Sequence, residues 1–129
     1  MTPFEIVQLI VRILLAAIFI GMGVAHFRRG PRRTMAKMIP PRMRRRGALR
    51  PEVLVAITGV CEIAGGIGLL VPATRVPAAV LLAVFLVAVF PANAYAARHG
   101  ETFGRLATPL VPRLIGQLAL IALCVVAAL

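Results

Sequence analysis

The stretch Glu52–Val71, with the sequence EVLVAITGVCEIAGGIGLLV, gives the clearest indication of how this chain folds. It is apolar along most of its length and carries a single acid in its interior, Glu62. Small residues lie three or four positions from Glu62, which is the spacing of one helix face. A helix in lipid turns such an acid inward, and small residues let a partner helix approach it closely. These neighbours are Thr58, Gly59, Gly65 and Gly66.

The composition indicates a membrane protein. Of the 129 residues, 60% are hydrophobic, which leaves too little polar surface for a soluble domain of this size. A spanning helix needs about 20 apolar residues to cross roughly 30 Å of hydrocarbon, and lipid favours helices over open sheet. We therefore predict an all-α fold, a four-helix transmembrane bundle that forms one domain over residues 1–129. The predicted helices cover about residues 4–27, 52–71, 76–97 and 109–129.

Basic residues are concentrated in the first connection between predicted helices. The interval Arg28–Arg50 carries ten basic residues and no acid, and this asymmetry predicts a cytoplasmic loop, with both termini non-cytoplasmic. The loop is expected to attract anionic lipid headgroups or to dock a partner. Nucleic acid is not an expected partner, because no aromatic residues are interleaved with the charges. The basic residues are Arg28, Arg29, Arg32, Arg33, Lys37, Arg42, Arg44, Arg45, Arg46 and Arg50.

Polar side chains recur at comparable depths within the predicted spans. An isolated charge there costs at least ~2.5–3.5 kcal/mol, so we expect Glu62 to pair with Arg12 or Arg113, or to be neutral if neither arginine reaches it. Residue counts along each helix place six polar side chains in the cytoplasmic half of one bundle. Either they hold the helices together by interhelical hydrogen bonds and ion pairs, or they line a cavity, open to the cytoplasm, that binds a headgroup, a quinone or a small redox ligand. The six residues are Glu62, Arg12, Arg113, Gln117, Asn93 and His26.

Proline and small residues predict two local features. Pro91 lies inside the third predicted helix, where it removes a backbone hydrogen bond and favours a kink. Both a plain kink and a kink that shapes a site are compatible with this position. Ala17, Gly21 and Ala25 form a stripe of small residues on the first helix, which favours contact within the bundle over dimerisation.

The sequence offers no pattern for a redox thiol pair or a metal site. Cys61 and Cys124 belong to no Cys-x-x-Cys motif and lie at different predicted depths, so we expect neither a disulfide nor a dithiol centre. His26 and His99 lie on different helices, without a carboxylate or thiol at ligand spacing. We therefore predict no metal and no catalytic residue.

Five short motifs follow one another along nearly the whole chain. They are Gly23–Phe27, Met38–Pro41, Thr58–Glu62 with Gly65–Pro72, Phe90–Asn93, and Arg113 with Gln117. Together they resemble the DoxX family of small bacterial membrane proteins. The resemblance implies a multi-pass protein of the bacterial inner (plasma) membrane that associates with redox partners. Relatives include a subunit linked to thiosulfate:quinone oxidation and a member of an oxidative-stress complex. The arginine-dense first loop departs from the family pattern.

These patterns favour three functions, in decreasing order. The first is a non-catalytic membrane subunit or anchor for a redox or oxidative-stress complex, docked through the basic loop. The second is a quinone- or lipid-binding protein with a polar intramembrane site around Glu62. The third is a small transporter, for which four helices leave little lumen and no inverted repeat is visible.

Overall fold

The computed structural model describes residues 1–43, 50–99 and 110–129, and every regular element in these ranges is helical. Four helices, namely α1, α3, α4 with the turn before it, and α6, are long and apolar enough to cross a membrane. The prediction of an all-α, four-helix bundle is confirmed, and the four spans indicate a multi-pass membrane protein. The helices are α1 (Pro3–Ala25), α2 (Arg29–Met38), α3 (Pro51–Leu70), α4 (Arg75–Arg98) and α6 (Leu110–Ala128), with 3-10 turns η1 (Pro41–Met43) and η3 (Pro72–Thr74).

Local sequence signals set where the helices begin. Thr2 and Glu5 form a capping box at the start of α1: the Glu5 amide donates to Thr2 Oγ1 over 3.1 Å, and the Thr2 amide donates to Glu5 Oε2 over 2.9 Å. Pro3 and Pro51 occupy the first turns of α1 and α3, where a missing N–H removes no helical bond. The observed ends of the spanning helices lie within two residues of the predicted ones.

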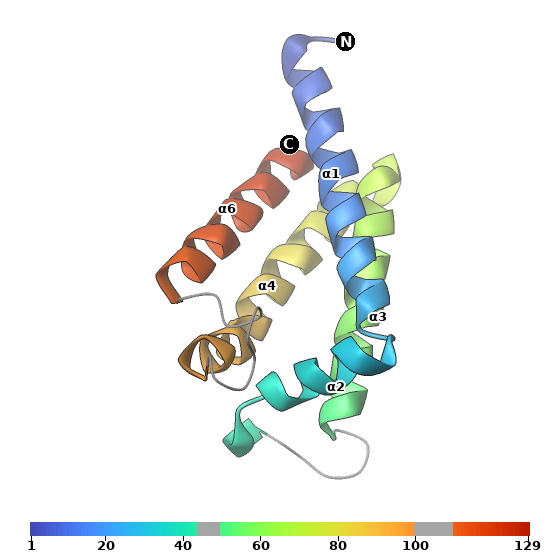
Figure 1. Cartoon of the computed structure of the whole chain (residues 1–129). Coiled ribbons are helices and arrows are strands. Elements are labelled where there is room, and N and C mark those ends of the chain that lie inside the picture. The colour runs from blue at the N-terminus through green and yellow to red at the C-terminus, as the bar shows by residue number, and fades with distance from the viewer. Residues whose placement is uncertain (44–49, 100–109) are drawn as a thin grey trace.

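The helix α3 lies beside α1 (Figure 1). It packs against α1 on one side and α4 on another, and α6 packs on α4. The N-terminal part of α1 extends beyond the ends of the other helices (Figure 1). The short helix α2 lies across the opposite end of the bundle, which we call the basic end.

Glycines bring α1 and α3 into close contact around Glu62. A Cβ atom on Gly23 would lie 2.8 Å from the carbonyl oxygen of Gly59, and a Cβ on Gly59 would lie 2.7 Å from the Cβ of His26. Two turns along α3, a Cβ on Gly66 would approach a side chain of α1 to 2.8 Å. The predicted role of these glycines as a contact surface beside the acid is therefore confirmed.

The close-packing face of α1 differs from the predicted stripe. Ala17 and Gly21 are exposed, and no atom of the described residues lies within 4 Å of a Cβ built on Gly21. Ala16 and Gly23, both buried, face α3 instead. The prediction of Gly21 as a contact residue is wrong, because one helix position corresponds to a rotation of about 100°.

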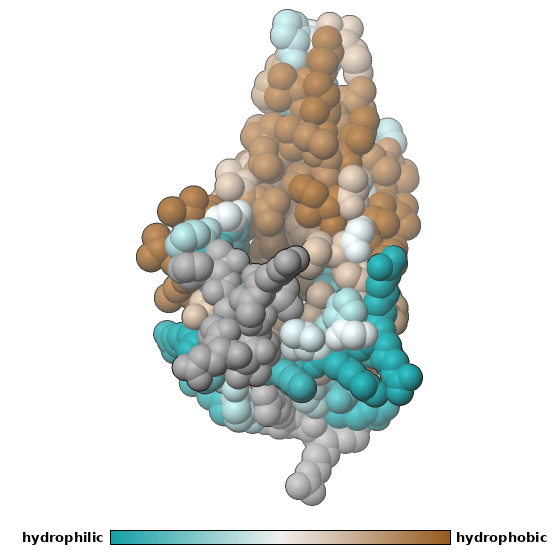
Figure 2. All heavy atoms as spheres, viewed as in Figure 1, coloured by the Kyte–Doolittle hydropathy of each residue, from teal (hydrophilic) through white to brown (hydrophobic). Residues whose placement is uncertain are grey.

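Apolar side chains form both the interior and most of the exterior of the spans. The core contains Leu15, Leu69 and Leu82, which are almost completely buried. Large apolar residues such as Val84 and Ile115 are more than half exposed on the outside. Figure 2 shows this apolar surface over the upper part of the molecule, above a hydrophilic lower end. Such an exterior is suited to contact with acyl chains.

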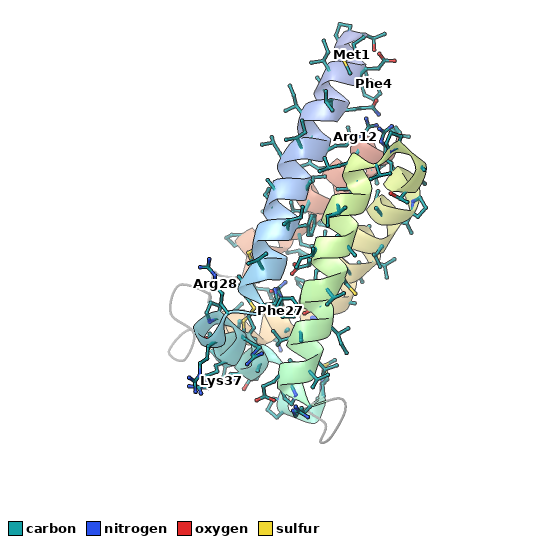
Figure 3. All side chains as sticks on the ribbon, turned by 90° about the vertical axis from the view of Figure 1, so that its right-hand side faces the viewer. Met1, Phe4, Arg12, Phe27, Arg28 and Lys37 are labelled. Carbon is teal, nitrogen blue, oxygen red and sulfur yellow. The ribbon has the colours of Figure 1, made fainter. Side chains whose placement is uncertain are left out.

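The basic end carries the cationic surface of the first connection. On the side facing the bundle, Met38 of α2 is buried against Ala96 of α4. On the outer side the arginines are exposed, and Arg28 and Lys37 mark the two ends of α2 in Figure 3. The exposed arginines are Arg28, Arg29, Arg33, Arg42 and Arg50, Arg32 is half-buried, and Arg44, Arg45 and Arg46 lie outside the described residues.

Candidate functional site

A cavity of about 410 Å³ lies within the bundle near the basic end. All the long helices contribute to its wall, and α2 and η1 contribute as well. Apolar side chains such as Phe19 of α1 and Phe85 of α4 line most of it. A few polar side chains supply the rest, namely His26, Thr58, Glu62, Asn93 and Arg113.

Glu62 and His26 form the polar centre of this cavity. Glu62 Oε2 lies 3.0 Å from His26 Nδ1, and the two residues are only 6% and 9% exposed. The pair joins α3 to the C-terminal end of α1, where the helices pack most closely through Gly59. Whether both groups are charged or both are neutral, the pair carries no net charge, which lowers the cost of burying either group.

The backbone fixes where His26 carries its proton. The carbonyl oxygen of Met22 lies 2.6 Å from Nδ1 and can only accept a hydrogen bond, so Nδ1 is the protonated nitrogen. This N–H points at Met22, and Glu62 Oε2 receives no hydrogen bond from the described residues. A buried acceptor without a donor costs about 1–3 kcal/mol. Glu62 Oε2 is therefore an atom at which a donor from a bound molecule would be stabilised.

Asn93 and Arg113 join α4 to α6 at the cavity wall. Arg113 Nη1 donates to Asn93 Oδ1 over 3.1 Å. Two residues before Asn93, Pro91 lies inside α4 and also lines the cavity. The chain stays helical through Pro91, and the last turns of α4 point in a new direction (Figure 1). The bend predicted at Pro91 thus coincides with the part of α4 that carries Asn93 into the site.

The predicted pairing of Glu62 with Arg12 or Arg113 is wrong, since His26 is the ion-pair partner of Glu62 among the described residues. Arg12 lies at the far end of the bundle (Figure 3), where its Nε donates to the carbonyl oxygen of Ala127 over 2.9 Å. Counting residues from the start of α1 gave the wrong depth for Arg12, because α1 extends beyond the other helices. The side chain of Arg12 consequently lies nearer the end of α6 than the level of Glu62.

The six candidate residues therefore separate into two groups. Glu62, His26, Asn93 and Arg113 all line the cavity, which brings four of the predicted residues together. Arg12 and Gln117 do not line it. Gln117 is buried, and its Oε1 has no hydrogen-bond partner among the described residues.

Methionines are the cavity-lining residues that sequence reasoning missed. Four of the chain's five methionines line the cavity. Methionine is flexible and polarisable, so it adapts to irregular ligands. The signal was present in α2, where two methionines three positions apart interrupt a basic helix, which is the spacing of a buried face. The four are Met22, Met35, Met38 and Met43.

The cavity suits an organic molecule better than an ion. Within residues 1–43, 50–99 and 110–129, no three His, Cys, Asp or Glu side chains are close enough to hold a metal. Cys61 and Cys124 are free thiols, with Cys124 buried in the core. A largely apolar cavity of this volume with a few polar groups is the usual environment of a small amphiphilic ligand.

Comparison with known proteins places the chain in one family. No curated protein and no solved structure matches it. A family model described as "Domain of unknown function (DUF8561)" matches residues 15–128, a range that includes the second half of α1, the other three spanning helices and the polar residues of the cavity. The protein is therefore a member of the DUF8561 family.

Proposed function

We propose that this protein binds a membrane-soluble amphiphile, a quinone or a lipid, in the cavity around Glu62. The observation that carries the proposal is Glu62 Oε2, which is buried in an apolar cavity and receives no hydrogen bond from the described residues. A donor on the ligand, such as the hydroxyl of a hydroquinone or of a lipid head, would satisfy this oxygen. The volume of about 410 Å³ is sufficient for such a molecule.

The distribution of side chains gives the ligand a direction. His26, Asn93 and Arg113 lie near the helix ends at the basic end, whereas Phe19 and Phe85 lie deeper in the spans. An amphiphile would direct its polar group toward the first set and its apolar body toward the second. Amide and guanidinium N–H groups can donate to a quinone carbonyl or a lipid ester.

The rim of the cavity supports entry from the bilayer. Ile18 and Met22 of α1 both line the cavity, yet they are 47% and 45% exposed on an apolar span. They therefore border an opening at the depth of the acyl chains. A ligand dissolved in the membrane would reach Glu62 by this route without crossing water.

Binding to the purified protein in detergent tests this function. A short-chain benzoquinone, its hydroquinone and a phospholipid would be titrated in parallel against the wild type and Glu62→Gln. We expect at least one probe to bind and its affinity to fall about tenfold, ~1.4 kcal/mol, in Glu62→Gln. The matched control is Glu5→Gln, the same change at the exposed start of α1. Equal affinity in all three proteins, or no binding by any probe, would contradict the proposal.

A second candidate function is a non-catalytic subunit of a redox complex, as the DoxX resemblance implies. Two observations support this candidate. Residues of all five DoxX-like motifs line one cavity. The exposed Arg28, Arg29 and Arg33 offer a surface for an acidic partner. We include membership of the DoxX family and a bacterial inner-membrane location in this proposal. Transport is not carried forward, because the well-packed core of Leu15, Leu69 and Leu82 gives it no support.

Co-purification from mild detergent tests the second candidate. A partner carrying a redox cofactor should copurify with the wild type and be lost when Arg28, Arg29 and Arg33 are all changed to glutamine. Loss of the partner in the triple variant, with the cavity ligand retained, would support docking through α2. A partner retained equally by the triple variant would exclude this surface as the docking site.

A further inference from the structure

A second hollow lies on the outside of the bundle, where α2 meets the start of α3. Its volume is about 430 Å³, and none of its lining residues also lines the cavity around Glu62. The two sites occupy different faces of α3, because Leu54, Val55 and Thr58 face the cavity while Val53 and Val60 face the hollow. We call this hollow the α2–α3 groove. Its lining residues are Arg32, Arg50, Glu52, Val53, Ala56, Ile57 and Val60.

The apolar part of the groove can hold a segment of one acyl chain. It follows α3 from Val53 to Val60, and seven residues of helix rise span about 10 Å. This is about a third of the roughly 30 Å hydrocarbon core, so it lies within the depth of one leaflet. Ile57 and Val60 are 46% and 57% exposed, so an acyl chain can lie against them. Ala56 also lines this part of the groove.

The polar part of the groove contains an arginine with a buried, unused donor. Arg32 Nε is buried and donates no hydrogen bond to the described residues. Arg50 lines the same end of the groove, immediately before α3. Guanidinium groups bind phosphate through charge-assisted N–H···O bonds, often in pairs. A phosphodiester at this position would satisfy Arg32 Nε at the depth where lipid headgroups begin.

Glu52 adds a second, opposite charge to the same end. It is exposed in the first turn of α3 and has no ion-pair partner among the described residues. A carboxylate weakens the attraction of a site for a purely anionic head. It instead complements an ammonium group placed next to the phosphate. The pattern of two guanidinium groups and one carboxylate therefore matches phosphate and ammonium on one headgroup.

We propose that the α2–α3 groove binds one phospholipid of the phosphoethanolamine class, with its phosphate on Arg32 and Arg50, its ammonium on Glu52, and an acyl chain along Ala56–Val60. This site is independent of the cavity ligand. It also differs from the diffuse attraction of the basic end for anionic lipid, which depends on exposed arginines such as Arg33. The bound lipid would fix α2 against the start of α3, which Figure 3 shows side by side.

Native mass spectrometry of the full chain, released from micelles containing equal amounts of phosphatidylethanolamine, phosphatidylglycerol and phosphatidylcholine, tests the proposal. We expect the wild type to retain one phosphatidylethanolamine in preference to the other two. Arg32→Gln should reduce that retention about tenfold. Arg33→Gln, the same change one position along α2 but outside the groove, should leave it unchanged. Thermal unfolding of each variant checks that loss of lipid does not follow from loss of fold.

Glu52→Gln tests the headgroup assignment separately. We expect it to abolish the preference for phosphatidylethanolamine while one phospholipid is still retained. Glu5→Gln, at the exposed start of α1 and outside both sites, should change neither lipid retention nor preference. Neither Arg32 nor Arg33 lines the cavity, so failure of the cavity proposal leaves the comparison of their variants unaffected. Equal loss in Arg32→Gln and Arg33→Gln would overturn the groove as a site. Preferential retention of phosphatidylglycerol by the wild type, or displacement of the lipid by inorganic phosphate alone, would overturn the phosphoethanolamine assignment.

Discussion

The pairing of Glu62 with His26 depends on two glycines, which have no Cβ atom. Gly23 and Gly59 lack the Cβ atoms that would separate α1 from α3, and this contact brings His26 to the carboxylate. Because the two backbones lie close together, His26 can partner Glu62 in place of the arginine that an acid inside a membrane would otherwise require. A carboxylate held 3.0 Å from His26 can be buried without an arginine partner.

Substitutions at two glycines of α1 test this dependence. Gly23→Ala would place a Cβ 2.6 Å from Ile63 and 2.8 Å from the carbonyl oxygen of Gly59. We expect this variant to lose about 1–3 kcal/mol of unfolding free energy from overpacking and to weaken ligand binding. Gly21→Ala is the matched control, because nothing described lies within 4 Å of its Cβ. Unfolding in mixed micelles measures both, and equal stabilities would contradict the close contact of α1 with α3.

Among the helices, side chains of α1 donate hydrogen bonds to the last carbonyl groups of α6. The last carbonyl groups of a helix have no intrahelical donor. Gln8 Nε2 donates to Val126 O over 3.0 Å, and Arg12 Nε donates to Ala127 O over 2.9 Å. These two bonds join the first and last spans at the end opposite the cavity. The charge of Arg12 thus serves the packing of α6 rather than the ligand site.

Removal of the Arg12 side chain should loosen α6 without affecting the cavity. Arg12→Ala leaves the carbonyl of Ala127 without its donor, which costs about 1–3 kcal/mol when the group is buried. We expect faster hydrogen exchange in the last turn of α6 and unchanged affinity for the cavity ligand. Gln8→Leu should give a smaller change of the same kind. Loss of ligand binding with unchanged exchange in α6 would instead place Arg12 at the site.

The bend in α4 gives a second prediction about the helices. Pro91→Ala restores a backbone hydrogen bond, straightens the helix and moves Asn93 away from Arg113. We expect ligand affinity to fall about tenfold, while thermal stability is retained or increased. Pro77→Ala, at the start of the same helix, is the control, because a proline there blocks no intrahelical bond. Unchanged affinity in Pro91→Ala would show that the bend has no part in the site.

Across the whole molecule, hydropathy predicted the spans well because lipid imposes length and composition on each helix separately. The local small-residue pattern around Glu62 also predicted the contact of α3 with α1. The sequence did not predict how far each helix extends relative to its neighbours along the bundle axis. Arg12 could be placed only by knowing that α1 extends beyond its neighbours. The methionines of α2 were missed because the packing of a short basic helix depends on tertiary contacts.

The charge of the basic end predicts an orientation of the whole bundle in the membrane, which can be measured. The exposed arginines at the basic end should face the cytoplasm, so both termini should lie on the other side. Single cysteines at Thr2 and Arg29, in a chain lacking Cys61 and Cys124, would be labelled in intact cells with a membrane-impermeant maleimide. We expect labelling at position 2 and protection at position 29, and the reverse pattern would contradict the assigned orientation.

The four spans enclose a cavity whose polar centre is Glu62 with His26, and we propose that it holds a ligand. High-resolution cryo-electron microscopy of the protein in lipid nanodiscs, bound to a rigid fiducial partner, tests this proposal. We expect elongated density bordered by Phe19, Phe85 and Met38, with its polar end about 3 Å from Glu62. Side chains collapsed into a solid interior with no such density, or Glu62 turned to the acyl chains away from His26, would contradict the claim.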